Sequence, residues 1–216
     1  MEFGHVLKGS LLMDFLEYLD TLGVEDPRPF AKGTTSLIFR GRLGNREVVI
    51  KLQRPDSPRR NLGKEVKFTF MASLFGVSPP PLSSGSFKGL PYMIREFAEG
   101  EPILFADLEK KHLVGIALKT ALLDRLGIDH GQIQGGKHII IGGDVYIIDF
   151  EKSGFRRPKN LTSAMAMIFL GSNSISRRVS EKFEIDSEFK EEMKTALRAY
   201  KRSGTLSRLL ELLSSL

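Results

Sequence analysis

Lys51 and Glu65 are of residue types, and at a spacing, that would suit a functional ion pair. Lys51 ends the apolar run V-V-I-K and alternates with Val49, so it lies on the inward face of a predicted strand. A lysine on an inward face needs an anionic partner, and Glu65, in the helix predicted next along the chain, could be that partner. Two alternatives stay open: a lysine that reaches solvent past the sheet edge, and a glutamate that is simply solvated.

A turn of small residues, Gly33 to Ser36, lies between two predicted strands before Lys51. Backbone N–H groups and hydroxyls in such a turn can cover a phosphate group. The same residues would also suit an ordinary connection in an antiparallel meander.

The stretch from Asp129 to Glu151 is the third feature. It predicts a polar loop from Asp129 to Lys137, a strand at residues 138–141, a Gly-Gly-Asp turn, and a second strand at residues 145–148. Asp149 follows that strand directly. Because the hairpin would hold the polar loop and Asp149 close together, this stretch is a candidate site.

The elements that must position these residues fall into two blocks. In the first block we expect a helix at residues 9–23 with Ser10 as its cap, and a break at Pro27 and Pro29. Three strands are expected within residues 30–54, a helix at 61–75 with Phe75 on its apolar face, and two strands at 82–87 and 90–97.

The acidic segment A-E-G-E-P at residues 98–102 predicts a domain boundary. After it we expect a helix at 107–126 capped by Asp107, the hairpin, a helix at 161–170 capped by Asn160, and two helices within 187–216. Strands and helices are therefore segregated, which favours an α+β fold over a parallel α/β sheet. The expected segments are 1–26, 27–98 and 99–216.

Composition excludes several classes of site. The chain has no cysteine, so disulfides and thiolate chemistry are excluded, and its four scattered histidines disfavour a histidine metal site. No run of about 20 apolar residues and no signal peptide is evident, so we expect a cytoplasmic protein with no membrane partner. The net charge of +6 permits an anionic partner such as a nucleotide or RNA.

In chain order, the small-residue turn, V-V-I-K, the helical glutamate and the strand ending in I-I-D-F resemble the signature set of the protein kinase family. The resemblance covers about residues 30–155. In its small size the chain is similar to archaeal kinases such as the RIO kinases and the small kinase of the tRNA threonylcarbamoyl-adenosine machinery. The resemblance implies a bilobal protein-kinase-like fold, with a small antiparallel β-sheet lobe carrying one helix and a mainly helical lobe carrying a β-hairpin.

The resemblance also implies that Mg²⁺ and ATP bind between the lobes. Lys51 would grip the phosphates, Glu65 would orient Lys51, and Asp149 would hold the metal ion. Further contacts to ATP are implied for Gly33, Thr34, Thr35, Ser36, Glu96 and Phe97.

Several positions depart from the family pattern. The turn has only one glycine, and Glu151 replaces the glycine of the Asp-Phe-Gly motif, which argues against a flipping activation loop. His130 matches the catalytic-loop histidine, but Gln132 stands in the place of the catalytic aspartate and Lys137 in the place of the metal-binding asparagine.

Gln132 cannot accept a proton as a base. Protonated Lys137 cannot ligate Mg²⁺, although it could replace the charge of a second ion. Alternatively, Asp129 supplies the base and Gln134 serves as a neutral metal ligand. Because positioning and charge stabilisation dominate phosphoryl transfer, loss of the base would slow such a site more than abolish it.

Three functions follow from the resemblance and its departures. The first is an atypical serine/threonine kinase acting on a protein or a small hydroxyl compound. The second is a nucleotide-binding pseudokinase with a regulatory or scaffolding role. The third is a basic RNA- or ribosome-associated protein that uses the cationic clusters at residues 54–64 and 156–159, which would equally suit solvated loops.

Overall fold

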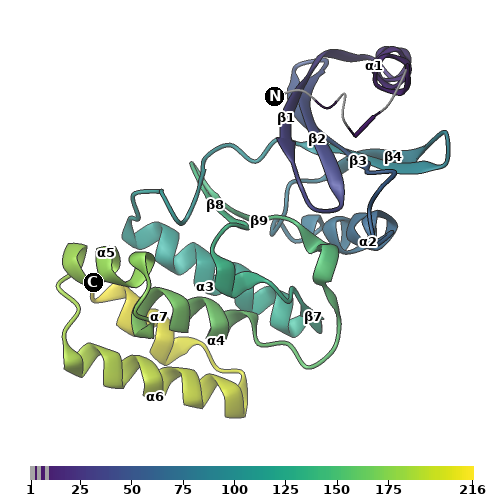
Figure 1. Cartoon of the computed structure of the whole chain (residues 1–216). Coiled ribbons are helices and arrows are strands. Elements are labelled where there is room, and N and C mark those ends of the chain that lie inside the picture. Colours follow the sequence, from purple (N-terminus) through teal and green to yellow (C-terminus); the bar gives the residue numbers. More distant parts are fainter. Residues whose placement is uncertain (1–2, 4–5, 8–9) are drawn as a thin grey trace. The chain divides into compact units, whose positions relative to one another are not determined.

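The computed structural model describes residues 3, 6–7 and 10–216 (Figure 1). Two compact units make up the chain. The first unit comprises Met1–Leu74, Ser78–Ala98 and Asp149–Glu151, and the second comprises Phe75–Val77, Glu99–Ile148 and Lys152–Leu216. Strands dominate the first unit and helices the second, which confirms the predicted α+β class.

A five-stranded antiparallel sheet forms the centre of the first unit, in the strand order β1-β2-β3-β5-β4. Its strands are β1 (Val24–Lys32), β2 (Ser36–Leu43), β3 (Arg46–Gln53), β4 (Pro81–Phe87) and β5 (Leu90–Glu96). The predicted meander and the two later strands are thereby confirmed. Strand β3 lies between two neighbours, so its residues from Val48 to Gln53 are all buried.

Strand β1 corrects one expectation. It runs through Pro27 and Pro29, where the sequence predicted a break. Its pairing with β2 shifts register between Glu25 and Arg28 and again between Pro29 and Ala31. Proline is tolerated here because β1 is an edge strand, so a missing N–H need not serve a second neighbour.

Helix α1 (Leu11–Thr21) packs the buried side chains of Phe15 and Leu19 into the core of the first unit. The Phe15 ring lies 5.5 Å from the ring of Phe39 in β2. The Ser10 hydroxyl does not cap the helix; it donates to the Asp14 carboxylate at 3.0 Å. Residue 9, where the helix was expected to begin, lies outside the described residues.

Helix α2 (Leu62–Ser73) is the one helix between strands that the sequence predicted. Phe68 and Ala72 are buried, and so is Glu65. Phe75 was expected on the same apolar face. That expectation is wrong, because the helix ends at Ser73 and the Phe75 side chain is 51% exposed.

Helix α3 (Lys110–Arg125) lies against α4 (Asn160–Met165) and α7 (Ser207–Ser214) in the second unit. Its expected cap, Asp107, is wrong. The helix begins after Glu109, whose backbone N–H donates to Nδ1 of His112 at 3.1 Å. The Asp107 carboxylate instead accepts from Lys182 at 2.6 Å.

The predicted hairpin is confirmed as β8 (Ile139–Ile141) and β9 (Val145–Ile147), with Ile141 paired to Val145. Strand β6 (Glu101–Pro102) adds to the other side of β8. Gly100 is required there, because a Cβ on it would lie 2.1 Å from the Ile141 carbonyl oxygen. The glycine of the A-E-G-E-P segment therefore allows the chain to pass close to the hairpin.

The remaining elements of the second unit are short or helical. Strands β7 (Ile128–Asp129) and β10 (Gly154–Phe155) pair with each other, and α4 continues as a π-helical turn at Ala166–Leu170. Helices α6 (Ser187–Ser203) and α7 confirm the two expected helices, separated at Gly204, whose φ is 72°. Helix α5 (Ser174–Lys182) was not predicted. Among the described residues, no helix is long and apolar enough to cross a membrane.

Candidate functional site

A buried salt bridge joins β3 to α2 in the first unit. Lys51 Nζ donates to Glu65 Oε1 at 2.6 Å, and the two side chains are 9% and 3% exposed. Lys51 is opposite Ile38 of β2 and Met93 of β5, so apolar neighbours flank it on both sides. The partner predicted for Lys51 is therefore present, and Glu65 is not a solvated residue of its helix.

Asp149 completes this cluster. Its Oδ1 lies 3.4 Å from Lys51 Nζ, and its side chain is 28% exposed. The backbone of Asp149 has a φ of 67°, a left-handed conformation that is uncommon outside glycine and costs strain energy. The segment Asp149–Glu151 belongs to the first unit, although the chain on either side of it belongs to the second.

Arg95 is a member of the cluster that the sequence reading missed. It lies in β5 opposite Val49, on the sheet face that carries Lys51 two residues further along β3. Burial lowers the pKa of Arg95, while the carboxylates of Glu65 and Asp149 act to raise it. The alternation of P-Y-M-I-R-E, paired against V-V-I-K, is the signal that could have identified Arg95.

The charges around Lys51 keep its ammonium group protonated next to the partly exposed carboxylate of Asp149. Burial alone would lower the pKa of Lys51, but the carboxylates of Glu65 and Asp149 outweigh it and raise that pKa above its ordinary value. Burial, together with the Asp149 carboxylate, raises the pKa of Glu65 above its ordinary value, although Lys51 acts to lower it. Lys51 is therefore a cation at neutral pH, next to the partly exposed Asp149.

The small-residue turn before β2 is closed by an internal hydrogen bond, and a second hydrogen bond joins it to Glu151. The Gly33 N–H donates to the Ser36 carbonyl at 2.8 Å, and the Thr35 hydroxyl donates to Glu151 Oε2 at 2.9 Å. The side chain of Gln53 donates to the Thr35 carbonyl at 2.7 Å. Thr34 is the exposed residue of the turn. Two donors that were expected to cover a phosphate are thus already used within the first unit.

The backbone at Glu96 and Phe97, where contacts to ATP were expected, also has partners within the first unit. The Glu96 N–H donates to the Pro80 carbonyl at 3.1 Å, and the Phe97 N–H donates to the Glu47 carbonyl at 2.9 Å. The Glu96 carbonyl accepts from Arg95 at 2.8 Å. Three of the four backbone polar groups of Glu96 and Phe97 are therefore already hydrogen-bonded.

In the second unit, His130 fixes the start of the polar loop. The ring is fully buried, and its Nε2 lies 2.9 Å from the Ile148 carbonyl oxygen at the end of the hairpin. The backbone N–H of His130 donates to the side-chain oxygen of Asn160 at 2.9 Å. The polar loop is thus attached to the residue just before Asp149.

Asn160 was expected to cap the helix that follows it, and this is wrong. It is the first residue of α4, and its side-chain nitrogen donates to Asp124 at 2.8 Å and to the Ile128 carbonyl at 2.7 Å. The cap is supplied from α3 instead, because the Asp124 carboxylate accepts the N–H groups of Asn160 and Leu161 at 2.8 and 3.2 Å.

Asp129 and both predicted glutamines, Gln132 and Gln134, line one cavity of about 280 Å³. The Asp129 carboxylate is in an ion pair with Arg156 Nε at 2.5 Å. Gln132 is half-buried, and Gln134 is exposed and within 3.4 Å of the Ser163 hydroxyl. Lys137 is exposed and does not line this cavity, so the structure groups the first three residues and leaves Lys137 apart.

Few side chains of the first unit are placed to ligate a metal ion. Among the described residues, no three His, Cys, Asp or Glu side chains are grouped as a metal site. Mg²⁺ commonly keeps several waters and binds one or two carboxylates together with substrate phosphates. Asp149 fits that arrangement as a single carboxylate, provided that the phosphates supply most of the other ligands.

No protein family model matches the chain. Over 98 residues the chain is 40% identical to a Methanocaldococcus jannaschii protein named "Uncharacterized protein MJ1211". The match covers 42% of this chain and 84% of that protein, whose name states no activity. At this identity and coverage, the chain belongs to the same family as the M. jannaschii protein MJ1211.

Proposed function

We propose that the chain is an ATP-dependent phosphotransferase of the protein kinase type, an atypical serine/threonine kinase. One observation carries this proposal: the buried Lys51–Glu65 salt bridge with the Asp149 carboxylate 3.4 Å from the same ammonium group. A lysine held by a glutamate is a fixed point charge for phosphate oxygens. An adjacent carboxylate with some exposure is a ligand for the metal ion that accompanies those phosphates.

In this proposal each residue of the cluster has a separate task. Glu65 keeps Lys51 charged and in place, and Lys51 contacts the phosphates of ATP. Asp149 would hold Mg²⁺, which neutralises charge on the transferred phosphoryl group. The left-handed backbone at Asp149 supports this role, because strained residues persist where the surrounding structure fixes them and are concentrated at functional sites.

The acceptor hydroxyl would be oriented by Asp129 or Gln132. Asp129 is ion-paired with Arg156, and Gln132 can donate and accept hydrogen bonds but cannot take a proton. We therefore expect slow turnover that depends on positioning and charge. The acceptor is a serine or threonine of a protein, or a small hydroxyl compound.

A second candidate is a pseudokinase that binds the nucleotide without transferring phosphate. The bond between Thr35 and Glu151 favours this alternative, because it engages a phosphate-covering hydroxyl and keeps a carboxylate near the turn. In that case ATP would raise the melting temperature of the protein, and no phosphate would be transferred.

The test is phosphate transfer from radiolabelled ATP in the presence of Mg²⁺. Asp149→Asn removes the charge but suits the same backbone, because asparagine also tolerates a positive φ. Transfer should fall at least about a hundredfold, the effect typical of losing one electrostatic contact in a transition state. Asp26→Asn is the matched control, since Asp26 also has a positive φ, 48°, and is exposed in β1.

The Asp129→Asn and Gln132→Ala variants identify the residue that orients the acceptor. Loss of transfer in Asp149→Asn alone would remove Asp129 from the proposed mechanism. Measurable ATP binding without transfer by the wild type would favour the pseudokinase. If Mg²⁺ and ATP neither bind nor raise the melting temperature, both candidates are wrong.

A further inference from the structure

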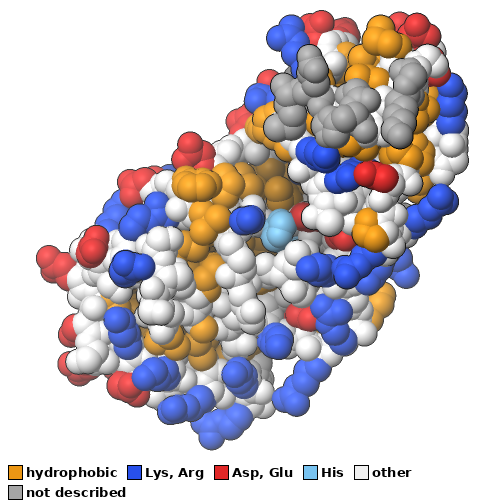
Figure 2. Space-filling model, in the orientation of Figure 1, with side chains coloured by type: hydrophobic (Ala, Val, Ile, Leu, Met, Phe, Trp, Pro, Cys, Tyr) orange, Lys and Arg blue, Asp and Glu red, His pale blue; other side chains and the backbone are white. Residues whose placement is uncertain are grey.

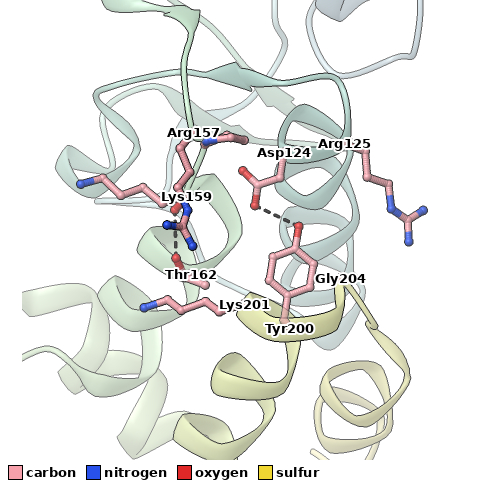
Figure 3. Close-up of a pocket in the computed structure, with 9 residues that line it drawn as sticks. Asp124, Arg125, Arg157, Lys159, Thr162, Tyr200, Lys201 and Gly204 are labelled. Atoms are coloured by element: carbon pink, nitrogen blue, oxygen red, sulfur yellow. Dashed lines mark hydrogen bonds between the residues drawn. The ribbon is translucent and has the colours of Figure 1, made fainter.

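A basic cavity of about 500 Å³ lies in the second unit, outside the cluster around Lys51 (Figure 3). It is formed where α3 and α6 end and α4 begins. Its lining includes four cationic residues, and these are Arg125, Arg157, Lys159 and Lys201. Pro158 and the ring of Tyr200 add non-polar wall. Figure 2 shows many Lys and Arg side chains on the visible face of this unit.

The cations that line this cavity are not neutralised by acidic partners. Within the described part of the chain, Arg157, Lys159 and Lys201 form no salt bridge, and all three are exposed. In contrast, Arg156 next to them is paired with Asp129. The cavity therefore carries an excess of positive charge that an anion would stabilise.

Asp124 is the acidic residue of this cavity, and its carboxylate is occupied. It accepts from the Asn160 N–H and side chain at 2.8 Å and from the Tyr200 hydroxyl at 3.0 Å. Burial raises the pKa of Asp124 in spite of these donors. In Figure 3 the Tyr200 hydroxyl points at this carboxylate. Asp124 thus holds the wall of the cavity together and has little capacity to neutralise the cations around it.

The positive surface continues beyond this cavity. Lys159 also lines two neighbouring cavities of about 280 and 420 Å³, and Lys201 lines the second of these. Arg156 lines the first. Because Lys159 lines all three cavities and Lys201 lines two of them, the three adjoin one another, and we call them together the track.

We propose that this track binds single-stranded nucleic acid through its phosphate backbone. A polyanion that carries flat, mostly non-polar groups between its charges matches adjoining cavities whose linings are cationic. An acidic peptide would match the charge but not the hollows. A single strand is required, because a base must leave the duplex stack to enter a hollow. The inference does not rest on phosphate transfer at Asp149.

The test is fluorescence anisotropy of a labelled oligouridylate over a series of salt concentrations. The triple variant Arg157→Gln/Lys159→Gln/Lys201→Gln should bind at least about tenfold more weakly. The slope of log K against log salt should become shallower by about 2, since each phosphate contact on a single strand contributes about 0.7. Single Lys201→Gln, at an exposed position, should lower the slope by about 0.7.

The matched control removes three exposed cations of the same unit that line none of the three cavities, and it is Lys111→Gln/Arg177→Gln/Arg208→Gln. It should keep the wild-type slope. The proposal is overturned if the control weakens binding as much as the track variant. It is also overturned if the wild type shows no salt-dependent binding, or if polyglutamate displaces the oligouridylate as well as unlabelled oligouridylate does. Asp149→Asn should bind the oligouridylate normally.

Discussion

At the scale of single residues, the Lys51–Glu65 pair shows what sequence could predict. Lys51 was identifiable because strand alternation places it inward beside Val49. Glu65 remained ambiguous, since the sequence does not state which face of α2 meets the sheet. Arg95 was missed because its place in the cluster depends on strand register, which pairs it with Val49.

The buried pair also makes a prediction about stability. Glu65→Gln leaves the buried Lys51 ammonium without its closest counter-charge, so we expect a loss of about 3 kcal/mol in unfolding free energy, the low end for breaking a buried pair. The low end applies because Asp149 stays 3.4 Å from Lys51. Urea denaturation at neutral pH measures the loss.

Replacing both residues separates two contributions to the unfolding free energy: the cost of an unpaired buried charge and the stabilisation that the salt bridge itself provides. In Lys51→Met/Glu65→Leu both charges of the bridge are removed and Asp149 still offsets the buried Arg95, so stability should return to within about 1 kcal/mol of wild type. A double variant that is less stable than Glu65→Gln would contradict this account of the pair.

At the scale of elements, local signals predicted most of the helices and strands, and tertiary context decided the exceptions. The hairpin at residues 139–147 was evident from two apolar runs around a glycine turn. Strand β1 was not, because its prolines are acceptable only at a sheet edge. Helix α5 was missed because only Ile175 and Val179 supply its buried apolar face. The cap of α4 comes from Asp124, which is remote in sequence.

Asp124 connects three helices, since it lies in α3, caps α4 and accepts from Tyr200 of α6. Asp124→Ala leaves the N–H groups at the start of α4 without partners, so we expect a loss of about 3 kcal/mol or more. Tyr200→Phe removes one hydrogen bond and should cost about 1 kcal/mol. Urea denaturation gives both values.

The order of these two effects is the informative result. If Tyr200→Phe destabilised the protein as much as Asp124→Ala, the link to α6 and not the cap of α4 would be the main role of Asp124. A near-neutral Asp124→Ala would show that water replaces the carboxylate at the helix start.

At the scale of the whole molecule, the sequence placed a boundary at residues 98–102, and the first unit includes the chain up to Ala98. The same unit also contains helix α1 and the distant segment Asp149–Glu151. That membership depends on long-range contacts such as Thr35 with Glu151, for which the local sequence carries no signal.

Asp149–Glu151 belongs to the first unit, so the amides of this segment should exchange with solvent when that unit opens. A cavity in the core of the first unit, Leu37→Ala, should cost about 3 kcal/mol and speed the exchange of the Phe150 and Glu151 amides about a hundredfold, if these amides open with that unit. The comparable substitution in the second unit, Leu123→Ala, should leave them protected. Both leucines are fully buried.

NMR-detected exchange resolves these amides from those of β9, which precede them in the chain and belong to the second unit. In Leu37→Ala the β9 amides should keep their protection while those of Phe150 and Glu151 lose it. If both sets respond together to either substitution, the two units unfold as one, and the segment that carries Asp149 has the stability of the whole chain. If the segment responds only to Leu123→Ala, its assignment to the first unit is wrong.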